Sequence, residues 1–340
     1  MNSKKKNFGN VLQKRSRFSL PYYGKDLVKW YYRFVRGPTT KSKENIQYIP
    51  KRFALNILDS KKPLTIVFIG DIMELKERDL VIGNGIREFI KNADYVIGNF
   101  EGTITNEARL YMDQRHKLQI IDALTSLFQP EQFFLSMANN HSGDFGRSTF
   151  RKSIKLLEDS GFTTFGTIDR PFVDIADTIR IIAGTAWSNR PCEYIVNFFD
   201  TPRYINPDLF NILYAHWGYE LYCYPNKEMV QLAKAYLDDF GAIIGHHSHA
   251  PQPVTYEKYN GINKLVGYSL GDFSYGDDYP KNNLENYRYG IILKVQVGED
   301  VKGHMNVGEI IWEFIASHPY ENDSFIVEII DTLPILEKKD

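Results

Sequence analysis

Short apolar runs alternate with helical stretches between residues 64 and 273 of the chain. The runs are rich in Val, Ile and Phe, which is typical of buried strands. They cover residues 64–70, 95–100, 133–138, 178–184, 210–215 and 242–245. Helical patterns fall near residues 79–92, 117–128, 148–160 and 226–240. This alternation predicts an α/β fold.

The last third of the chain has a different pattern. Strand-like segments at residues 264–268, 289–297 and 309–314 are separated by turns, without helical stretches between them. Strands joined by short turns run antiparallel. We therefore expect antiparallel strands to complete the sheets.

Five of the apolar runs lead directly to residues that can bind a metal ion. Ligands of open α/β sheets bind beyond the carboxyl ends of the strands, so polar side chains at these ends are expected to share one site. The residues in these positions are Asp71, Glu101, Asn140-His141, His216 and His246-His247-Ser248-His249.

The first 36 residues are strongly basic, with ten Lys and Arg against the single acid Asp26. A helix is predicted from Asp26, as its cap, to Arg36, because apolar and basic side chains separate at three- and four-residue spacing. The two predicted faces are Leu27, Tyr31, Phe34 and Val35 on the apolar side, and Lys29, Arg33 and Arg36 on the basic side.

Two interpretations of this helix stay open. A basic amphipathic helix can lie on an anionic membrane surface. Alternatively, the helix docks on the protein and its lysines are solvated. In either case we divide the chain into a basic N-terminal appendage, residues 1–60, and a main domain, residues 61–340.

The overall charge argues against a nucleic-acid-binding protein. Outside residues 1–36 the chain keeps 31 of its 41 basic residues and 41 of its 42 acidic residues, so the main domain is acidic. The two cysteines, Cys192 and Cys223, are typical of a reducing compartment, although one disulfide stays possible. No apolar run approaches the roughly 18 residues of a membrane span. A cytoplasmic location, with a possible peripheral membrane contact, is the expectation.

The histidines that follow the apolar runs are the strongest candidates for metal ligands. A single histidine is more often structural, but five of the eight lie just beyond strand-like runs. We interpret His216, His247 and His249 as ligands. His246 is expected to orient a ligand or to pack, because adjacent residues seldom reach one ion together.

The oxygen donors are ambiguous when each is taken alone. Asp71 follows a strand, where an aspartate also caps helices. Glu101 has two oxygens that can bridge two cations, and the alternative is a surface glutamate in a turn. Asn140 offers a neutral oxygen and His141 can donate a proton, although Asn-His pairs are common in turns. The full set favours a metal centre.

Six motifs in order resemble the poly-γ-glutamate capsule synthesis CapA family, within the calcineurin-like metallophosphoesterases. They span roughly residues 64–275. The matching stretches are Gly70-Asp71-Ile72-Met73, Asn99-Phe100-Glu101-Gly102, Ala138-Asn139-Asn140-His141 with Asp144 and Gly146, His216-Trp217-Gly218-Tyr219-Glu220, the His-rich loop ending at Gln252, and Tyr268-Ser269-Leu270-Gly271-Asp272-Phe273.

The resemblance implies a two-sheet β-sandwich flanked by helices, in α/β/β/α layers, around a two-metal centre. One ion would be held by Asp71, Glu101 and His249, and the other by Glu101, Asn140, His216 and His247. His141 would protonate the leaving group and Asp144 would orient it. Residues 268–273 would form a loop at the rim.

The chain departs from the pattern of the wider superfamily at several positions. Met73 stands where a histidine is usual, and Glu101 stands where an aspartate usually bridges the ions. The first metal site is therefore expected to be weak. Leu75-Lys76 stands where CapA-like chains often have a Gly-Arg pair, and Asp272 stands where an asparagine is usual in the final loop. We expect Asp272 to contact substrate.

Glu220, four residues after His216, has three open interpretations. It contacts substrate, it supports a ligating histidine, or it is an ordinary solvated glutamate. Mixed imidazole and carboxylate ligands suit Mn, Fe or Zn. Two divalent ions of this kind are the expected cofactors.

Three functions follow as hypotheses. The first is a metal-dependent hydrolase or transfer protein acting on a poly-γ-glutamate-like capsule or another anionic cell-envelope polymer. The second is a non-catalytic accessory protein for polymer synthesis or export, near a membrane synthase. The third is a phosphodiesterase or phosphatase for small phosphoester substrates.

Overall fold

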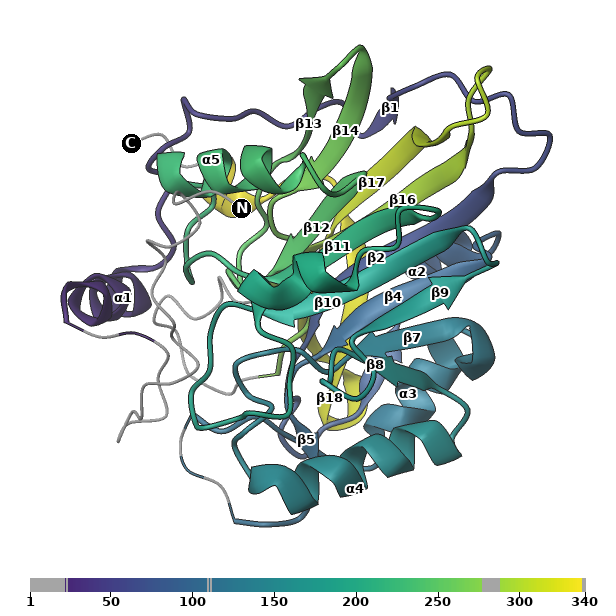
Figure 1. The fold of residues 1–340 in the computed structure, drawn as a ribbon. Coiled ribbons are helices and arrows are strands. Elements are labelled where there is room, and N and C mark those ends of the chain that lie inside the picture. The colour runs from purple at the N-terminus through teal and green to yellow at the C-terminus, as the bar shows by residue number, and fades with distance from the viewer. Residues whose placement is uncertain (1–21, 23, 109, 111, 277–287, 338–340) are drawn as a thin grey trace.

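Two β-sheets lie face to face in the computed structural model, with helices on their outer surfaces (Figure 1). The structure describes residues 22, 24–108, 110, 112–276 and 288–337. Residues 1–21, which carry six of the ten basic residues of the predicted appendage, lie outside the described part.

The first sheet has ten strands. Along its main path the order is β3-β18-β17-β16-β2-β4-β7-β8, while β1 pairs with β17 and β15 pairs with β2. Its parallel half, β2-β4-β7-β8, leads to the predicted site residues Asp71, Glu101, Asn140, His141 and Asp144. The bounds are β1 Arg52–Ala54, β2 Leu64–Ile72, β3 Leu80–Ile82, β4 Tyr95–Phe100, β7 Phe133–Ser136, β8 Thr163–Phe165, β15 Asp272–Ser274, β16 Tyr289–Glu299, β17 Met305–Tyr320 and β18 Ser324–Ile330.

The second sheet has six strands in the order β13-β14-β12-β11-β10-β9. Its central strands β10, β11, β12 and β14 are parallel, and β9 and β13 are antiparallel edges. The bounds are β9 Phe172–Ile175, β10 Ile179–Thr185, β11 Phe210–His216, β12 Ala242–His246, β13 Val254–Tyr259 and β14 Ile262–Gly267. A separate pair is formed by β5 Thr103–Ile104 and β6 Arg115–His116.

Three apolar cores hold the layers together. The inner core joins the facing sides of both sheets, for example Phe68 of β2 and Tyr214 of β11. A second core packs the outer face of the first sheet against α2 Asn84–Ile90, α3 Ile120–Leu127 and α4 Gly146–Asp159. A third packs the second sheet against α5 Lys227–Tyr236. The predicted α/β/β/α sandwich is confirmed.

Most predicted elements occur with small shifts of their ends. The stretch near residues 79–92 was predicted as helix, but it begins with strand β3 and only Asn84–Ile90 is helical. That strand pairs with β18, a partner more than two hundred residues away, so no local pattern marks it. The remaining short elements are the 3-10 helices η3 Pro130–Gln132, η4 Phe198–Tyr204 and η6 Glu321–Asp323, and α6 Pro334–Glu337.

The N-terminal helix α1, Lys25–Arg36, lies outside both sheets (Figure 1). Its N-cap is Gly24, and Asp26 lies in the first turn, so the predicted Asp26 cap is wrong. The predicted faces are also wrong in part. Arg33 is buried, whereas Tyr31 and Val35 are 63% and 49% exposed.

The domain boundary after residue 60 stays a prediction. Part of the predicted appendage belongs to the sandwich, because β1 pairs with β17 and Tyr48 packs against the inner core. Among the described residues, no helix has the length and apolar character that a bilayer crossing requires.

Candidate metal centre

The predicted site residues converge where β2, β4 and β7 of one sheet end beside β11 and β12 of the other. Register explains the convergence, since Asp71 of β2 pairs with Asn99 of β4, and His216 of β11 pairs with His246 of β12. Every candidate is buried: Asp71, Glu101, Asn140, His141, Asp144, His216, Glu220, His247, His249 and Asp272. Contacts among their side chains link all ten into one cluster.

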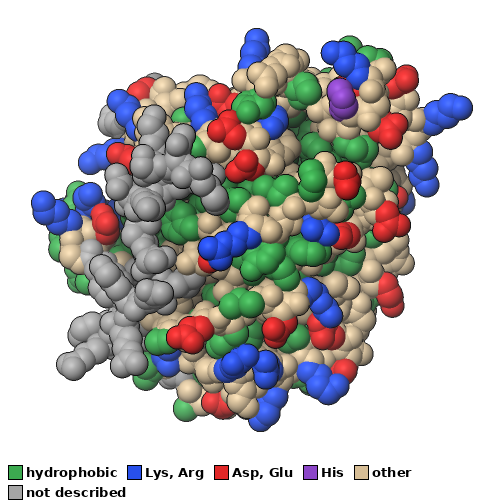
Figure 2. Space-filling view, viewed as in Figure 1, with side chains coloured by type: hydrophobic (Ala, Val, Ile, Leu, Met, Phe, Trp, Pro, Cys, Tyr) green, Lys and Arg blue, Asp and Glu red, His purple; other side chains and the backbone are tan. Residues whose placement is uncertain are grey.

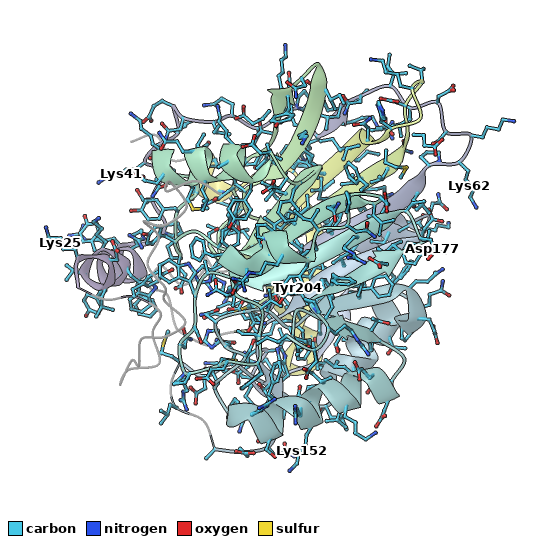
Figure 3. The ribbon with its side chains drawn as sticks, in the orientation of Figure 1. Lys25, Lys41, Lys62, Lys152, Asp177 and Tyr204 are labelled. Carbon is cyan, nitrogen blue, oxygen red and sulfur yellow. The ribbon has the colours of Figure 1, made fainter. Side chains whose placement is uncertain are left out.

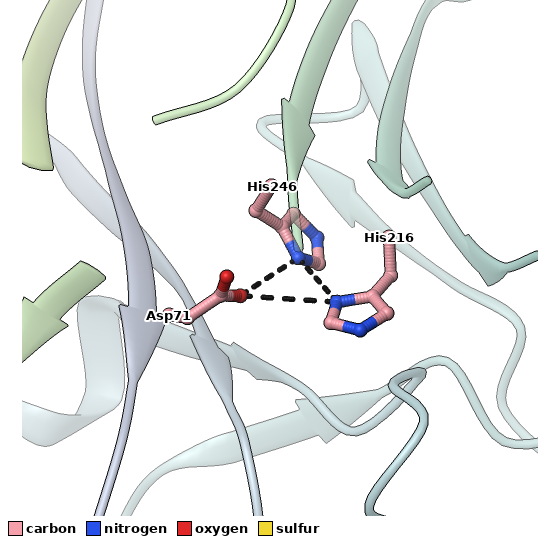
Figure 4. Close-up of side chains that lie close together, drawn as sticks. All are labelled: Asp71, His216 and His246. Atoms are coloured by element: carbon pink, nitrogen blue, oxygen red, sulfur yellow. Dashed lines mark hydrogen bonds and ion pairs between the residues drawn. The ribbon is translucent and has the colours of Figure 1, made fainter. Parts of the chain in front are cut away.

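Asp71 forms a compact group with His216 and His246 (Figure 4). Oδ1 of Asp71 lies 3.0 Å from Nδ1 of His246 and 3.8 Å from Nδ1 of His216. The two imidazole nitrogens are 2.8 Å apart. The side chain of Asn99 and the backbone N–H of His247 also donate to this carboxylate, at 2.7 and 2.8 Å. Asp71 is therefore rigidly oriented.

Glu101 lies at the middle of the centre, between three of the candidate histidines. Both oxygens are buried and find no partner among the described residues. Oε1 is instead 3.7 to 4.0 Å from ring nitrogens of His141, His216 and His249. A buried polar atom without a partner is costly, and separations of this size suit donors that share an ion.

Two overlapping groups of donors match the two ions that the resemblance implies. Asp71, Glu101 and His249 offer donor atoms within 4.8 Å of one another, and so do Glu101, His216 and His247. Oδ1 of Asn140 lies 2.7 Å from Nε2 of His216 and adds an oxygen to the second group. Imidazole and carboxylate donors around an unpartnered glutamate fit a pair of divalent cations. The assignment of each ligand stays a prediction.

Asp272 supports His249 from behind. Its Oδ1 lies 2.8 Å from Nδ1 of His249, which leaves Nε2 of that ring facing Glu101. A carboxylate in this position fixes the orientation and tautomer of a ligating histidine. Asp272 is fully buried, so the geometry favours a supporting role over the predicted substrate contact, which stays untested.

The loop after β12 turns His247 and His249 toward the same centre. Both residues have positive φ, 94° and 49°, a backbone conformation that is uncommon for side chains other than glycine. Gly245 precedes this loop. The indole N–H of Trp217 donates to the backbone carbonyl of Tyr268 at 2.9 Å, and both atoms lie so close to Gly245 that a Cβ would not fit there. Such strain clusters at functional sites.

His141 and Asp144 form the predicted proton-transfer pair. Nδ1 of His141 is 2.6 Å from Oδ2 of Asp144, while Nε2 points to Glu101. Asn189 lies 3.2 to 3.3 Å from both ring nitrogens and accepts from the side chain of Asn140. Sequence reasoning missed Asn189, although it follows the end of β10 at Thr185 and so lies, like the other candidates, near the carboxyl end of a strand.

The environment sets opposite charge preferences within the centre. Burial and the neighbouring histidines hold the pKa of His216 and of His247 well below the ordinary value, so both rings are neutral and can bind a cation. Burial raises the pKa of Asp71, but His246 and His249 outweigh it and the pKa falls to about 2.

The pKa of Glu101 is shifted in the opposite direction from that of Asp71. Burial and the charge of Asp71 raise its pKa well above the ordinary value. Burial also raises the pKa of Asp272 to about 7, against the opposing effect of His249. Acidic groups crowd this cavity, and positive charge brought between them would relieve the repulsion.

Glu220 is held at the edge of the centre by the N-terminal helix. Trp30 donates its indole N–H to Oε2 at 2.5 Å, and Arg33 donates to the backbone carbonyl at 2.9 Å. Glu220 also forms a third donor group with His247 and His249. It is not an ordinary solvated glutamate, since it is 6% exposed.

Comparison with protein families finds a match to the model described as "Bacterial capsule synthesis protein PGA_cap". The match covers residues 65–172 and 206–276, together more than half of the chain. Both segments contain candidate ligands.

Two curated relatives carry related names. The "PGA biosynthesis protein CapA" of Bacillus subtilis (strain 168) is 24% identical over 296 residues, covering 77% of this chain and 75% of the relative. The "Capsule biosynthesis protein CapA" of Bacillus anthracis is 26% identical over 259 residues. That alignment covers 64% of this chain and 61% of the relative, less than two thirds of its length. A hypothetical protein from Thermus thermophilus shares a TM-score of 0.41 and 14% identity, over 72% of this chain and 98% of that one.

Proposed function

This chain belongs to the family of bacterial capsule synthesis proteins described by the PGA_cap model, and we propose that it is a metal-dependent hydrolase or transfer enzyme acting on an anionic cell-envelope polymer. A poly-γ-glutamate-like polymer is the proposed substrate class, on the strength of the names of the relatives. The observation that carries the enzymatic part is the buried carboxylate of Glu101, unpartnered among the described residues and facing three histidines.

Two divalent ions held by the predicted ligands would supply a water of lowered pKa and positive charge for the attacked group. The protein's own residues provide orientation and proton transfer. Asp144 accepts the Nδ1–H of His141, so Nε2 faces the centre. Nε2 carries a proton when the ring is protonated and a lone pair when the ring is neutral. His141 is thereby placed to protonate a leaving oxygen or nitrogen.

The proposal is tested first by metal content. Elemental analysis of purified protein is expected to find up to two ions per chain, and fewer in H216A and N140A. The control is H304A, because His304 is exposed and lies in the turn between β16 and β17. Unchanged stoichiometry in the two site variants would refute the ligand assignment.

Activity is tested with a chromogenic phosphodiester and with poly-γ-glutamate, in the presence of Mn²⁺. Metal-dependent turnover of the phosphodiester alone would support the small-substrate phosphodiesterase instead. Shortening of the polymer would support amide cleavage. The two substrates therefore separate two of the three hypotheses.

A non-catalytic accessory role is the second candidate, and one observation favours it. The most exposed of the ten candidate residues, Glu220, is only 6% exposed, and such deep burial disfavours direct contact between the centre and a polymer. Such a protein would bind metal and support a polymer synthase at the membrane without cutting the polymer. Bound metal without turnover of either substrate would favour this role.

A further inference from the structure

Tyr22 reaches the metal centre from the opposite end of the chain. It is 2% exposed, although it precedes α1 and lies 225 residues before His247. Its ring packs edge-on against Trp187, with centroids 4.9 Å apart, and stacks on Tyr219 at 5.9 Å. The phenol is therefore held in one position.

The hydroxyl of Tyr22 contacts both a candidate ligand and the loop beside it. Oη lies 3.0 Å from Nε2 of His247. It also accepts the backbone N–H of Glu220 at 2.9 Å. Two contacts from different directions fix the oxygen against the imidazole.

The two nitrogens of His247 have different surroundings. Nδ1 is buried and has no hydrogen-bond partner among the described residues, whereas Nε2 faces Tyr22. A histidine that binds a metal through one nitrogen donates its other N–H to an oxygen. With an ion on Nδ1, the proton stands on Nε2 and Tyr22 supplies that oxygen.

From this geometry we propose that Tyr22 is a positioning residue of the metal centre, which orients His247 through Nε2. The inference rests on the proposed metal site. The segment made of Tyr22 and α1, here called the N-terminal strap, is then part of the centre. It completes the surroundings of the second ion rather than forming a separate appendage.

Further contacts bind the strap to the loop that follows β11. Trp30 and Arg33 hold Glu220, and the guanidinium of Arg33 lies 4.3 Å from the ring centroid of Tyr222. Thr39, just after α1, exchanges backbone hydrogen bonds with Leu221 and Cys223 at 2.9 and 3.0 Å. Because β11 ends at His216, the loop that the strap contacts also leads directly from a second candidate ligand.

The test is the Tyr22→Phe variant, which keeps the ring and removes the hydroxyl. Affinity for Mn²⁺ and for Zn²⁺ is measured by competition with a chelating dye. Loss of such a supporting hydrogen bond is expected to weaken binding by roughly 10- to 100-fold. The matched control is Tyr32→Phe, on the same helix but 62% exposed, with expected wild-type affinity.

The melting temperature of the metal-free protein distinguishes a tyrosine that only packs from one that positions His247. If Y22F lowers that temperature but leaves metal affinity unchanged, Tyr22 only packs and the inference is overturned. Tenfold weaker binding with a near-native metal-free melting temperature supports it. Absence of metal binding in the wild type would overturn the proposed function as well, so the two failures are distinguishable.

A separate observation concerns the outward face of α1. Val28, Tyr31, Tyr32 and Val35 are 70%, 63%, 62% and 49% exposed, and their spacing puts them on one stripe of the helix. Few large apolar side chains of the described residues are so exposed, and four of them share this short helix. An apolar stripe of this kind marks an interaction surface.

Basic side chains flank the stripe. Lys25, Lys29 and Arg36 are exposed, while the one acid of the helix, Asp26, lies 3.6 Å from Lys29. Figure 3 places Lys25 at the outer edge of the molecule, away from the sheets. In Figure 2, blue basic and green hydrophobic side chains gather at the left edge, where Figure 1 draws α1. The preceding residues 1–21 add six basic residues and no acid.

We infer that this face of α1 lies on an anionic lipid surface, with the stripe at the acyl boundary and the basic residues at the headgroups. Flotation with phosphatidylserine-containing and with pure phosphatidylcholine vesicles tests it. Binding is expected only to the anionic vesicles, weaker at high salt, and at least fivefold lower for Y31S/Y32S. The control is Ile57→Ser, an 83% exposed apolar residue away from α1.

Equal recovery of the wild type and Y31S/Y32S, or no recovery with anionic vesicles, would overturn the lipid assignment. Concentration-dependent dimerisation that Y31S/Y32S abolishes, seen by size-exclusion chromatography without vesicles, would point to a second copy as the occupant and would also overturn it.

Discussion

The hydroxyl of Tyr214 donates a hydrogen bond of 2.6 Å to the backbone carbonyl of Ile69, and this bond joins the two sheets across their inner core. Ile69 lies where the pairing of β2 with β4 shifts register, between Phe68 and Asp71. The same tyrosine ring packs on His246, with centroids 4.5 Å apart. One residue thus links the sandwich to the candidate metal centre.

Tyr214→Phe is expected to lower the free energy of unfolding by about 1–3 kcal/mol, because the buried carbonyl of Ile69 loses its cross-sheet donor. Urea denaturation measures the change. Tyr320→Phe serves as the control, since Tyr320 is 45% exposed at the end of β17. An unfolding free energy equal to that of the wild type would show that the bond is not stabilising.

Glu101→Gln is expected to have opposite effects on stability and on metal binding. The variant removes a buried carboxylate whose pKa is raised by burial and by Asp71, so the metal-free protein is expected to melt at a higher temperature. Metal affinity is expected to fall by at least roughly tenfold, since mutation of residues that only support a metal ligand already weakens binding by about this factor. Calorimetry and chelator competition measure the two effects.

The control for Glu101→Gln is Glu309→Gln, a partly exposed position in β17 that pairs with Arg52. It is expected to change neither quantity. If Glu101→Gln binds metal as tightly as the wild type, Glu101 is not a bridging ligand.

Asp144→Asn is expected to reduce turnover by roughly 10²- to 10⁴-fold, because Asp144 fixes the tautomer of His141. Metal stoichiometry is expected to stay at the wild-type level, since Asp144 belongs to neither donor group. Steady-state kinetics with elemental analysis check both outcomes, with Asp169→Asn, an exposed residue, as the control. Loss of metal together with turnover would assign Asp144 to the ion site instead.

His116 is expected to make stability depend on pH. Burial lowers its pKa from 6.5 to about 4, while its Nε2 lies 3.0 Å from the backbone carbonyl of Glu101. As the pH falls, His116 therefore becomes protonated near pH 6.5 in the unfolded chain but only near pH 4 in the folded chain. Stability is thus full above pH 6.5 and is lost as the pH falls toward 4, by about 2 kcal/mol between pH 7 and 5.

The comparison variant is His116→Gln, which keeps a polar side chain of similar length and cannot titrate. Unfolding free energies of the wild type and H116Q are measured in urea with EDTA present. The difference between them is expected to shrink by about 2 kcal/mol as the pH falls from 7 to 5. A constant difference would show that His116 does not stay neutral in the folded protein.

Local patterns predicted the α/β fold and a shared site for the polar residues at the strand ends, whereas the two-sheet sandwich and the role of Asp144 were implied by the resemblance to the CapA family. An apolar run marks a strand, and a polar residue at its end marks the shared edge of a sheet, as for Glu101 after β4. The role of Asp272 was harder to predict, because its contact with His249 depends on how β15 pairs with β2.

The N-terminal strap could not be predicted in the same way. Helical periodicity places Tyr31 and Arg33 on different faces, but it does not tell which face docks. Arg33 is buried because its Nε donates to the backbone carbonyl of Glu220 and its guanidinium lies over the ring of Tyr222, and no feature near Arg33 in the sequence indicates those partners. The contact between Tyr22 and His247 depends likewise on tertiary structure alone.

The candidate ligands are spread along the chain from Asp71 to His249, and Asp272 follows later still. During synthesis on the ribosome, the chain therefore lacks the full set of candidate ligands until His249 has been translated. If the centre binds metal as proposed, ion capture would be a late event of biogenesis, and a nascent or truncated polypeptide would hold the carboxylates of Asp71 and Glu101 without the imidazoles that accompany them.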